Sequence, residues 1–593
     1  MFAARTCVRN ASVTKPIAGF ITLQRRQSSA VRDSLLQAET PIAEQLAATN
    51  VWYYGRSAKA KGEKKIKGDK HRVNIVDEKL CDDVIGYIRP SLERHVGCDI
   101  VDLYPGAGLW SRKLHDVLQP RSHILLEPDA KLYAPFLEPL TSRPNVTILP
   151  KSGIVWGELN EVLTSKYLPH QVERNPRTST PERNDTLLVI ANLSFYPKRK
   201  YRGFANVAQL LLYQFVNSIR SGTLFQKYGL VRMLIWTGQE EVSGLVPRTI
   251  QRRKRLAVDG ELSTEYITEI AGSDNGKGHE GADRFHRDHN IDLDSVRGAF
   301  ERMKASGTVT PPGRETTMMK ELSALTEQAQ SAICAGSKPA TFDRPYRAEL
   351  AELEADFAAG KFSSADLQKH RRLIDLRYKV NWELRRHKLI HDMLSNTSTT
   401  PDEWDEQIKH LDKYLRIEFL LQRDNLHIWR QDPPVLTWDR RPFEPLVVRD
   451  KEFFPNVPGA LLDIQPKPTH PLLRQIGPGT SRAGDMFGSI LGPLMRHSID
   501  PVGKVLESIF PGAGEGVLPN CKTLNPGPGD GGMPPGYPEW NARSLNEAQF
   551  VDILQHWMEW PFRPSFSELV ARDSEDSDLV QDDEPSSVKM GDF

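Results

Sequence analysis

Short apolar runs alternate with amphipathic stretches along the chain from about residue 72 to residue 270. The first apolar run begins near Val96, and others occupy 124–126, 187–190 and 231–236. Strands that alternate with helices in this way are typical of a parallel sheet covered by helices on both faces. The pattern therefore predicts an α/β domain with a doubly wound, Rossmann-like sheet.

The pattern changes from about residue 271, where Gly, Asp, His and Lys replace the apolar runs. Two charged stretches follow, at 344–395 and 402–424, with leucines and aromatic residues at helical spacing. We interpret them as a solvated helical hairpin inserted into the sheet domain, and a partner-binding arm is the alternative. The apolar runs 446–448 and 460–464 predict strands that complete the sheet, and a helical C-terminal region follows them.

The N-terminus is basic and free of acidic residues up to Asp33. The basic residues before it are Arg5, Arg9, Lys15, Arg25, Arg26 and Arg32. Phe20, Ile21 and Leu23 are spaced for an amphipathic helix, which is typical of a mitochondrial transit peptide. The sequence therefore predicts import into the mitochondrial matrix. A basic, disordered tail that binds nucleic acid is the alternative.

These patterns divide the chain into segments. They are a transit peptide 1–32, a basic leader 33–71, a Rossmann-like core 72–270, a low-complexity loop and charged helical insertion 271–435, the completion of the sheet 436–468, a helical C-terminal domain 469–571, and an acidic disordered tail 572–593.

Composition narrows the class of protein. The chain has 593 residues, 39% of them hydrophobic, which is enough for a large core and a second domain. No apolar run has the length of a membrane span, so we expect a soluble protein. The five cysteines are scattered without a CxxC pair, which predicts neither a zinc site nor a disulfide framework. We interpret the segment His286-Arg287-Asp288-His289 as solvated loop rather than as a metal site.

Candidate chemistry begins at Asp102-Leu103-Tyr104-Pro105-Gly106-Ala107-Gly108, directly after the first strand. Glycines at that position let the backbone approach a ligand closely. The next strand ends at Glu127, where an acid can hold ribose hydroxyls. The arrangement predicts a nucleoside-type pocket, although a glycine pair alone also occurs in many tight turns.

A third apolar run ends in Asn192-Leu193-Ser194-Phe195. Together with the glycine turn and Glu127, it resembles the rRNA adenine N6-dimethyltransferase family, whose signature there is Asn-(Leu/Ile)-Pro-(Tyr/Phe). The resemblance implies a class I methyltransferase fold that binds S-adenosylmethionine. It also implies that Asn192 accepts a hydrogen bond from the adenine amine while Phe195 stacks on the base. For an isolated tetrapeptide, a strand-closing Asn and a core Phe would be the simpler interpretation.

The sequence is more similar to the fungal branch of that family, the mitochondrial transcription factor B proteins. The likeness rests on four motifs in order: 102–108, 231–236, Trp438-Asp439 and 559–564. It covers roughly residues 45–270 and 436–571. The resemblance implies a protein that assists the mitochondrial RNA polymerase.

The cofactor site departs from the active enzymes. Tyr104 stands where they have Gly, and Ser152 falls where they have an acid, so the charge-assisted part of a hydrogen bond is lost. Their N-terminal Gln-Asn-Phe-Leu motif is reduced to 73–76. We therefore expect S-adenosylmethionine binding to be weak or lost. The positions that the resemblance assigns to the cofactor are Asp102, Tyr104, Gly106, Gly108, Glu127, Ser152 and Asn192.

Basic residues interleaved with aromatic ones follow the Asn192 motif. The candidates for phosphate contacts are Lys198, Arg199, Lys200 and Arg202. A second basic run, 252–255, is equally consistent with a nucleic-acid contact and with a solvated face. The leading hypothesis is a transcription factor that binds melted promoter DNA. The alternatives are an active mitochondrial rRNA adenine N6-dimethyltransferase and a non-catalytic RNA-binding module, because fold does not fix function.

Overall fold

The computed structural model describes most of the chain, in ranges that leave both ends out. The described residues are 34–52, 67–175, 180–198, 204–274, 287–342, 344–527 and 532–572. The predicted transit peptide, Arg199, Lys200, Arg202, His286 and the acidic tail from 573 onward lie outside them.

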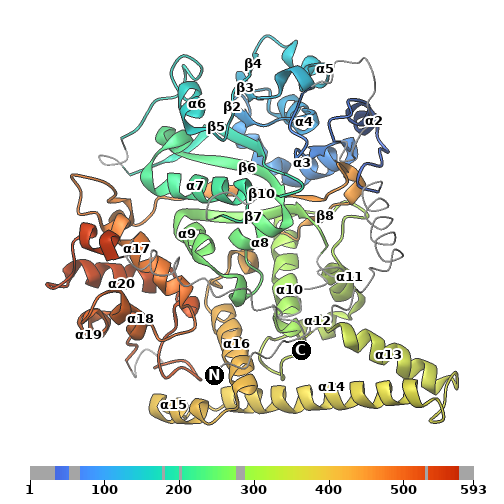
Figure 1. Ribbon diagram of the computed structural model, residues 1–593, viewed down its shortest axis with the longest axis vertical. Coiled ribbons are helices and arrows are strands. Elements are labelled where there is room, and N and C mark those ends of the chain that lie inside the picture. The colour runs from blue at the N-terminus through green and yellow to red at the C-terminus, as the bar shows by residue number, and fades with distance from the viewer. Residues whose placement is uncertain are drawn as a thin grey trace, which may run out of the picture.

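An eight-stranded sheet forms the centre of the molecule, with the strand order β4-β3-β2-β5-β6-β10-β7-β8 (Figure 1). Its strands are β2 (Asp99–Leu103), β3 (Ser122–Leu126), β4 (Val146–Leu149), β5 (Arg183–Asn192), β6 (Leu230–Gly238), β7 (Thr264–Gly272), β8 (Leu446–Val447) and β10 (Gly459–Pro466). β10 is antiparallel to both neighbours, β6 and β7, whereas the remaining pairs of this sheet are parallel. This order, with one antiparallel strand among parallel ones, is that of class I methyltransferases, so the predicted fold class is confirmed.

The first strand of the glycine motif starts later than the sequence suggested. β2 begins at Asp99, whereas Val96 is 59% exposed and the chain turns at Gly97, where φ is 76°. A short separate sheet pairs β1 (Asn74–Ile75) with β9 (Phe453–Phe454). It ties the segment before the core to the late part of the chain.

Helices cover both faces of the sheet. One face packs against α6 (Trp156–Val162), α7 (Val207–Ser221) and α8 (Gln239–Leu245). The other packs against α3 (Glu78–Leu92) and α4 (Leu109–Leu118). Successive strand residues point to opposite faces, so Val189 joins the first layer and Ile190 the second. α5 (Ala130–Thr141) packs with α2 (Pro41–Ala48) beside β3.

The helical insertion lies between β7 and β8. Its helices are α10 (His289–Ser306), α11 (Thr317–Ala324), α12 (Glu327–Ser331), α13 (Pro345–Ala358), α14 (Leu367–Leu394), α15 (Pro401–Lys409) and α16 (Lys413–Trp429). α14 lies along the edge of the molecule remote from the sheet, and α16 leads back toward it (Figure 1). The sequence pattern did not predict α10 to α12. Their stabilisation comes from tertiary packing, such as that of Met303 and Met319 against the sheet.

The interpretation of 286–289 as solvated loop is wrong for the described residues. Arg287 and Asp288 are both buried. The Arg287 guanidinium donates to both carboxylate oxygens of Asp439, at 2.7 and 2.9 Å, so an ion pair compensates its burial. His289 is the first residue of α10, and its Nε2 lies 2.7 Å from a carboxylate oxygen of Glu321.

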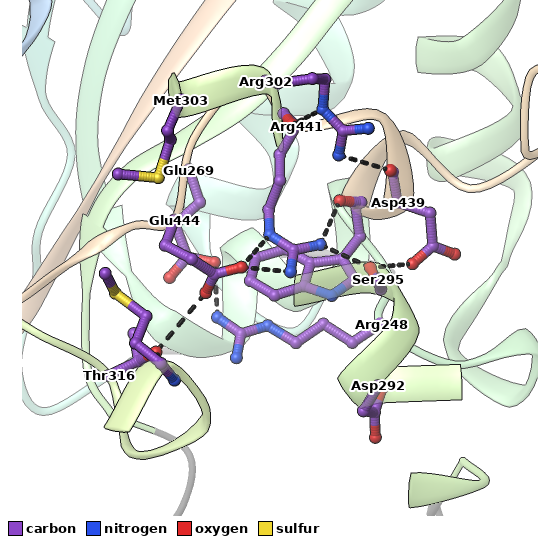
Figure 2. Close-up of polar contacts among 12 residues, drawn as sticks. Arg248, Glu269, Asp292, Ser295, Arg302, Met303, Thr316, Asp439, Arg441 and Glu444 are labelled. Carbon is purple, nitrogen blue, oxygen red and sulfur yellow. Dashed lines mark hydrogen bonds and ion pairs between the residues drawn. The ribbon is translucent and has the colours of Figure 1, made fainter. Parts of the chain in front are cut away.

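The Trp438-Asp439 motif anchors α10 to the sheet domain (Figure 2). Ser295 Oγ donates to Asp439 at 2.7 Å, and the Arg302 guanidinium donates to the Asp439 carbonyl at 3.1 Å. Arg248 and Arg441 lie over the Trp438 ring, 3.9 and 4.0 Å from its centroid. The motif therefore has a structural role in holding the insertion.

The C-terminal helices pack on α9 (Arg255–Ser263) and form a core of their own. They are α17 (Ala483–Arg496), α18 (Val502–Ile509), α19 (Ala513–Val517) and α20 (Glu547–Glu559). Asp424 of α16 joins them to the insertion, because it accepts hydrogen bonds from Tyr537, Asn541 and Arg543. Over the described ranges, no helix combines the length and apolarity needed to cross a membrane.

Candidate functional site

The turn after β2 brings three backbone positions into left-handed conformations. Tyr104 has a φ of 59°, which is costly for a residue with a Cβ atom. Gly106 also has a φ of 59°, and a Cβ there would lie 2.3 Å from Asn74 Oδ1. Gly108 (φ 68°) precedes α4, and a Cβ there would lie 2.4 Å from Leu137. The positive φ angles therefore favour glycine at both positions, and a Cβ there would also force a neighbouring side chain to shift.

Arg72 lies against Glu127, the acid that follows β3. Its Nη1 donates to Glu127 Oε1 at 3.1 Å, and its Nη2 donates to Oε2 at 3.3 Å and to the Tyr104 carbonyl at 2.9 Å. The backbone N–H groups of Gly106 and Asp129 donate to Oε2 and Oε1 at 3.0 and 3.1 Å. Each oxygen of Glu127 thus accepts two hydrogen bonds from the protein itself.

The Arg72–Glu127 pair is sealed from water, since the two side chains are 1% and 0% exposed. The Arg72 guanidinium lies 4.6 Å from the ring centroid of Tyr104 and 5.5 Å from that of Tyr133. Burial by itself lowers the pKa of Arg72, but the Glu127 carboxylate outweighs it and raises that pKa above its ordinary value. The guanidinium is therefore charged, and removing one partner would leave an uncompensated buried charge.

The backbone of Arg72 is held as firmly as its side chain. Trp52 Nε1 donates to the Arg72 carbonyl at 2.7 Å. Arg72 also forms an antiparallel β-bridge with Phe195. The segment before the core is thus fixed next to the Asn192 motif.

Tyr104 fills the space beside the glycine turn rather than pointing away from it. Its hydroxyl lies 2.6 Å from Ser152 Oγ, and its ring meets that of Phe195 at 6.3 Å between centroids. Burial raises the pKa of Tyr104, so the phenol stays neutral. The two residues that depart from the enzyme pattern, Tyr104 and Ser152, therefore contact each other directly.

Asn192 is the last residue of β5. Both the nitrogen and the oxygen of its side-chain amide form hydrogen bonds with backbone groups. Its Nδ2 donates to the Val73 carbonyl at 2.9 Å, and its Oδ1 accepts from the Ser194 N–H at 3.1 Å. An adenine amine that donates to Asn192 Oδ1 would have to compete with the Ser194 N–H for that oxygen. Phe195 lines a cavity of about 180 Å³, together with His71, Ile154, Pro197 and Val207 among others.

Asp102 contacts a histidine pair rather than the Arg72–Glu127 pair. Its carboxylate lies 3.4 Å from His123 Nε2, and His123 Nδ1 lies 3.1 Å from His115 Nδ1. Burial lowers the pKa of His115 to about 4, so that imidazole is neutral at physiological pH. The Asp102 carboxylate thus lies against His123 within the fold.

Lys198 is the described member of the basic loop. Its Nζ lies 2.8 Å from Glu240 Oε2 and 2.9 Å from Glu241 Oε1. Burial lowers the pKa of Lys198, but these two carboxylates outweigh that effect and raise it. In the second basic run, Arg253 is buried and paired with Glu261. Arg253 therefore contributes to packing, whereas Lys254 of the same run is exposed.

Glu127 shows whether S-adenosylmethionine fits, because each of its carboxylate oxygens already accepts two hydrogen bonds from the protein. Ribose hydroxyls would have to displace the Arg72 guanidinium, and Tyr104 occupies the space where the enzymes have no side chain. The residues present do not fit the cofactor in this arrangement. Sequence reasoning placed Glu127 but missed Arg72. Arg72 directly precedes the segment 73–76 that corresponds to the N-terminal enzyme motif, and nothing local in the sequence pairs it with Glu127.

Comparison with known proteins agrees with the fold. Residues 74–297 match the family model described as ribosomal RNA adenine dimethylase. The chain is similar to mitochondrial transcription factor 1 of Saccharomyces cerevisiae, with 24% identity over 28% of this chain and 45% of that protein. It is likewise similar to mitochondrial transcription factor 1 of Saccharomyces paradoxus, with 23% identity over 30% of this chain and 49% of that protein. The chain thus spans about half the length of these curated relatives.

A solved structure is also similar. It is the crystal structure of a dimethyladenosine transferase from Plasmodium falciparum, with 10% identity and a TM-score of 0.22, and the match covers 44% of this chain and 90% of that one. The similarity to the ribosomal RNA adenine dimethylase family model is confined to residues 74–297, within the sheet domain and the start of the insertion.

Proposed function

We propose that this chain is a mitochondrial transcription initiation factor that assists the mitochondrial RNA polymerase by binding melted promoter DNA, without transferring methyl groups. The observation that carries the proposal is the Arg72–Glu127 pair. To bind the cofactor, the protein would have to break a buried ion pair, which costs on the order of 3 to 5 kcal/mol. The two relatives named mitochondrial transcription factor 1 support the same assignment.

The base pocket can serve DNA opening without a methyl donor. Phe195 lines the cavity next to the loop that carries Arg199, Lys200 and Arg202, and an aromatic ring there can stack on an unpaired base. Basic side chains beside it would hold the phosphates of the same strand. Lys198 is paired with Glu240 and Glu241, so its contribution requires that a phosphate replace those carboxylates.

The site of action that we propose is the mitochondrial matrix. The acid-free, arginine-bearing leader supports import, and the relatives are mitochondrial by name.

The decisive experiment combines two measurements on the purified protein. Calorimetric titration with S-adenosylmethionine should give no binding at millimolar cofactor. Run-off transcription with purified mitochondrial RNA polymerase should depend on the protein on duplex promoters and much less on premelted ones. Micromolar cofactor binding together with methylation of a ribosomal RNA hairpin would replace the proposal with the dimethyltransferase alternative.

A further inference from the structure

Two adjoining cavities lie where α10, α14 and α16 meet the loop before Tyr537. Their volumes are about 300 and 230 Å³, and volumes near 300 Å³ are at the lower end of those that hold small organic ligands. The residues common to both linings are Leu394, Leu426, Arg430 and Pro535. Arg430 therefore lines both cavities, which together we call the groove.

The charged and titratable lining of the larger cavity consists of three basic residues and one acidic residue. Lys338, His391 and Arg430 line it, and within the described ranges none of the three forms an ion pair with a carboxylate. The nearby Arg423 differs, because Asp424 neutralises it at 2.8 Å. The one carboxylate in the lining, Asp288, already accepts the N–H groups of Asn290 and Thr341. The cavity thus presents an excess of positive charge.

Gln422 supplies an unused hydrogen-bond donor. Its side chain is 7% exposed and lines the larger cavity, and its Nε2 has no hydrogen-bond partner among the described residues. An unpaired buried amide costs folding free energy, and an acceptor on a ligand in the cavity would pair it. Ile291, Leu394 and Leu426 give the same cavity apolar surface.

The walls of the cavity are held in place by contacts outside it. The Asp294 carboxylate accepts from the Ala335 N–H at 3.0 Å, and His387 Nδ1 lies 2.8 Å from the Ala340 carbonyl. Gly336, between them, has a φ of 78°, and a Cβ there would lie 2.5 Å from Arg430 Nη2. Glycine at this position allows the loop to approach the guanidinium.

We propose that this groove binds a nucleoside phosphate. The phosphate would lie against Arg430 and Lys338, the base would lie on the apolar wall, and Gln422 would donate to an acceptor on the base edge. Arginine and lysine bind phosphate through charge-assisted hydrogen bonds, and a side-chain amide can read a base edge. The proposal goes beyond the transcriptional role and does not depend on it.

The test is calorimetric titration of the full chain with ADP, adenosine, inorganic phosphate and a 5′-phosphorylated single-stranded oligonucleotide. ADP should bind more tightly than either adenosine or phosphate alone. Arg430→Ala should weaken ADP binding by about tenfold or more, because a charge-assisted hydrogen bond is lost. Arg416→Ala is the matched control, since Arg416 is an exposed arginine of α16, the helix that Arg430 caps, and lines neither cavity.

Gln422→Leu separates recognition from folding. Replacing an unpaired buried amide by an apolar group of similar size should leave thermal stability unchanged or raise it, yet weaken ADP binding. Arg430-dependent binding of ADP, with the oligonucleotide weaker, identifies a free nucleotide as the ligand. Arg430-dependent binding of the oligonucleotide at least as tight as that of ADP identifies a strand end. Absence of binding by both, or equal losses in Arg430→Ala and Arg416→Ala, would overturn the proposal.

Discussion

An arginine sealed from water requires a carboxylate beside it, and in this chain Glu127 is that carboxylate. The same carboxylate stands where the related enzymes hold ribose. Its two oxygens accept four hydrogen bonds from Arg72, Gly106 and Asp129. At the scale of single residues, the pocket is therefore closed by a contact that also stabilises the fold.

The first prediction concerns reopening of the cofactor site. The double change Tyr104→Gly, Ser152→Asp should raise S-adenosylmethionine affinity, because it frees the space beside the turn and restores an acid. Adding Arg72→Ala should raise the affinity further, because Glu127 is then free to accept ribose hydroxyls. Calorimetric titration of the three proteins measures both effects.

Stability provides the control for that experiment. Arg72→Ala should lower the free energy of unfolding by about 3 to 5 kcal/mol, since Glu127 is left buried and unpaired. Arg112→Ala, which breaks a partly exposed pair with Glu78, should cost at most about 1 kcal/mol. Equal cofactor affinity in the double and triple variants would show that Arg72 does not compete with the ligand.

The residue scale also marks a limit of sequence reasoning. Glu127 could be placed because a strand and a glycine turn precede it in a fixed order. Its partner Arg72 lies 55 positions away, and nothing local to either residue indicates the pair. The hydrogen bonds of the Asn192 side chain with Val73 and Ser194 could not be predicted from the sequence either. They depend on how the segment around Val73 packs against the end of β5.

Among the elements, the loop after β5 is the one that would meet nucleic acid. Changing Lys198, Arg199, Lys200 and Arg202 together to Ala should weaken single-strand binding. It should also flatten the salt dependence by roughly 0.7 in log–log slope for each lost phosphate contact. Lys198 should contribute least, because Glu240 and Glu241 already neutralise it. Filter binding over a salt series measures the slope.

Phe195→Ala tests the stacking platform of the same element. Loss of stacking should cost about 1 to 3 kcal/mol per base with little dependence on salt. Under the proposed function, both variants should still bind the polymerase but fail at duplex promoters, and a premelted template should partly rescue them. Full run-off activity of both variants on duplex templates would remove this surface from the mechanism.

Asp424 joins α16 of the insertion to the C-terminal helices. Burial raises the pKa of this carboxyl, but the charges of Arg423 and Arg543 outweigh it and lower the pKa from 3.8 to about 2. The folded state therefore gains about 2 kcal/mol above pH 4, and that gain is lost as the pH falls from about 4 to 2.

Asp424→Asn should remove this pH-dependent gain. Thermal unfolding between pH 2 and 7 tests it, and parallel stability curves for the variant and the unchanged protein would contradict the assignment.

Elements of the sheet were easier to predict than those of the insertion. The strands are continuous apolar runs because helices bury both of their faces, and that pattern is readable in a single sequence. α10 and α11 pack only a few apolar residues against the sheet and α12 buries none, so their periodicity is weak. Their positions depend on long-range pairs such as Arg287 with Asp439, 152 positions apart.

For the whole molecule, we predict that the leader directs the protein to mitochondria. The intact chain should enter the mitochondrial matrix, because its arginines are drawn across an inside-negative membrane. A chain that starts near Asp33 should stay in the cytosol. Fluorescence microscopy with a C-terminal tag distinguishes the two, and mitochondrial signal from the shortened chain would refute the targeting role of residues 1–32.

The crowding of the glycine turn also bears on the evolutionary reversibility of this protein. Arg72 and Tyr104 each fill part of the same region, beside Asn74, whose Oδ1 accepts the Ala107 N–H at 3.0 Å. Under the proposed function, replacing either of the two alone leaves the other in place and adds a hole or an unpaired charge. A sequence that carries both would therefore be separated from cofactor-binding sequences by less stable intermediates. Selection for stable folding alone would therefore disfavour the substitutions that lead back to a cofactor-binding sequence.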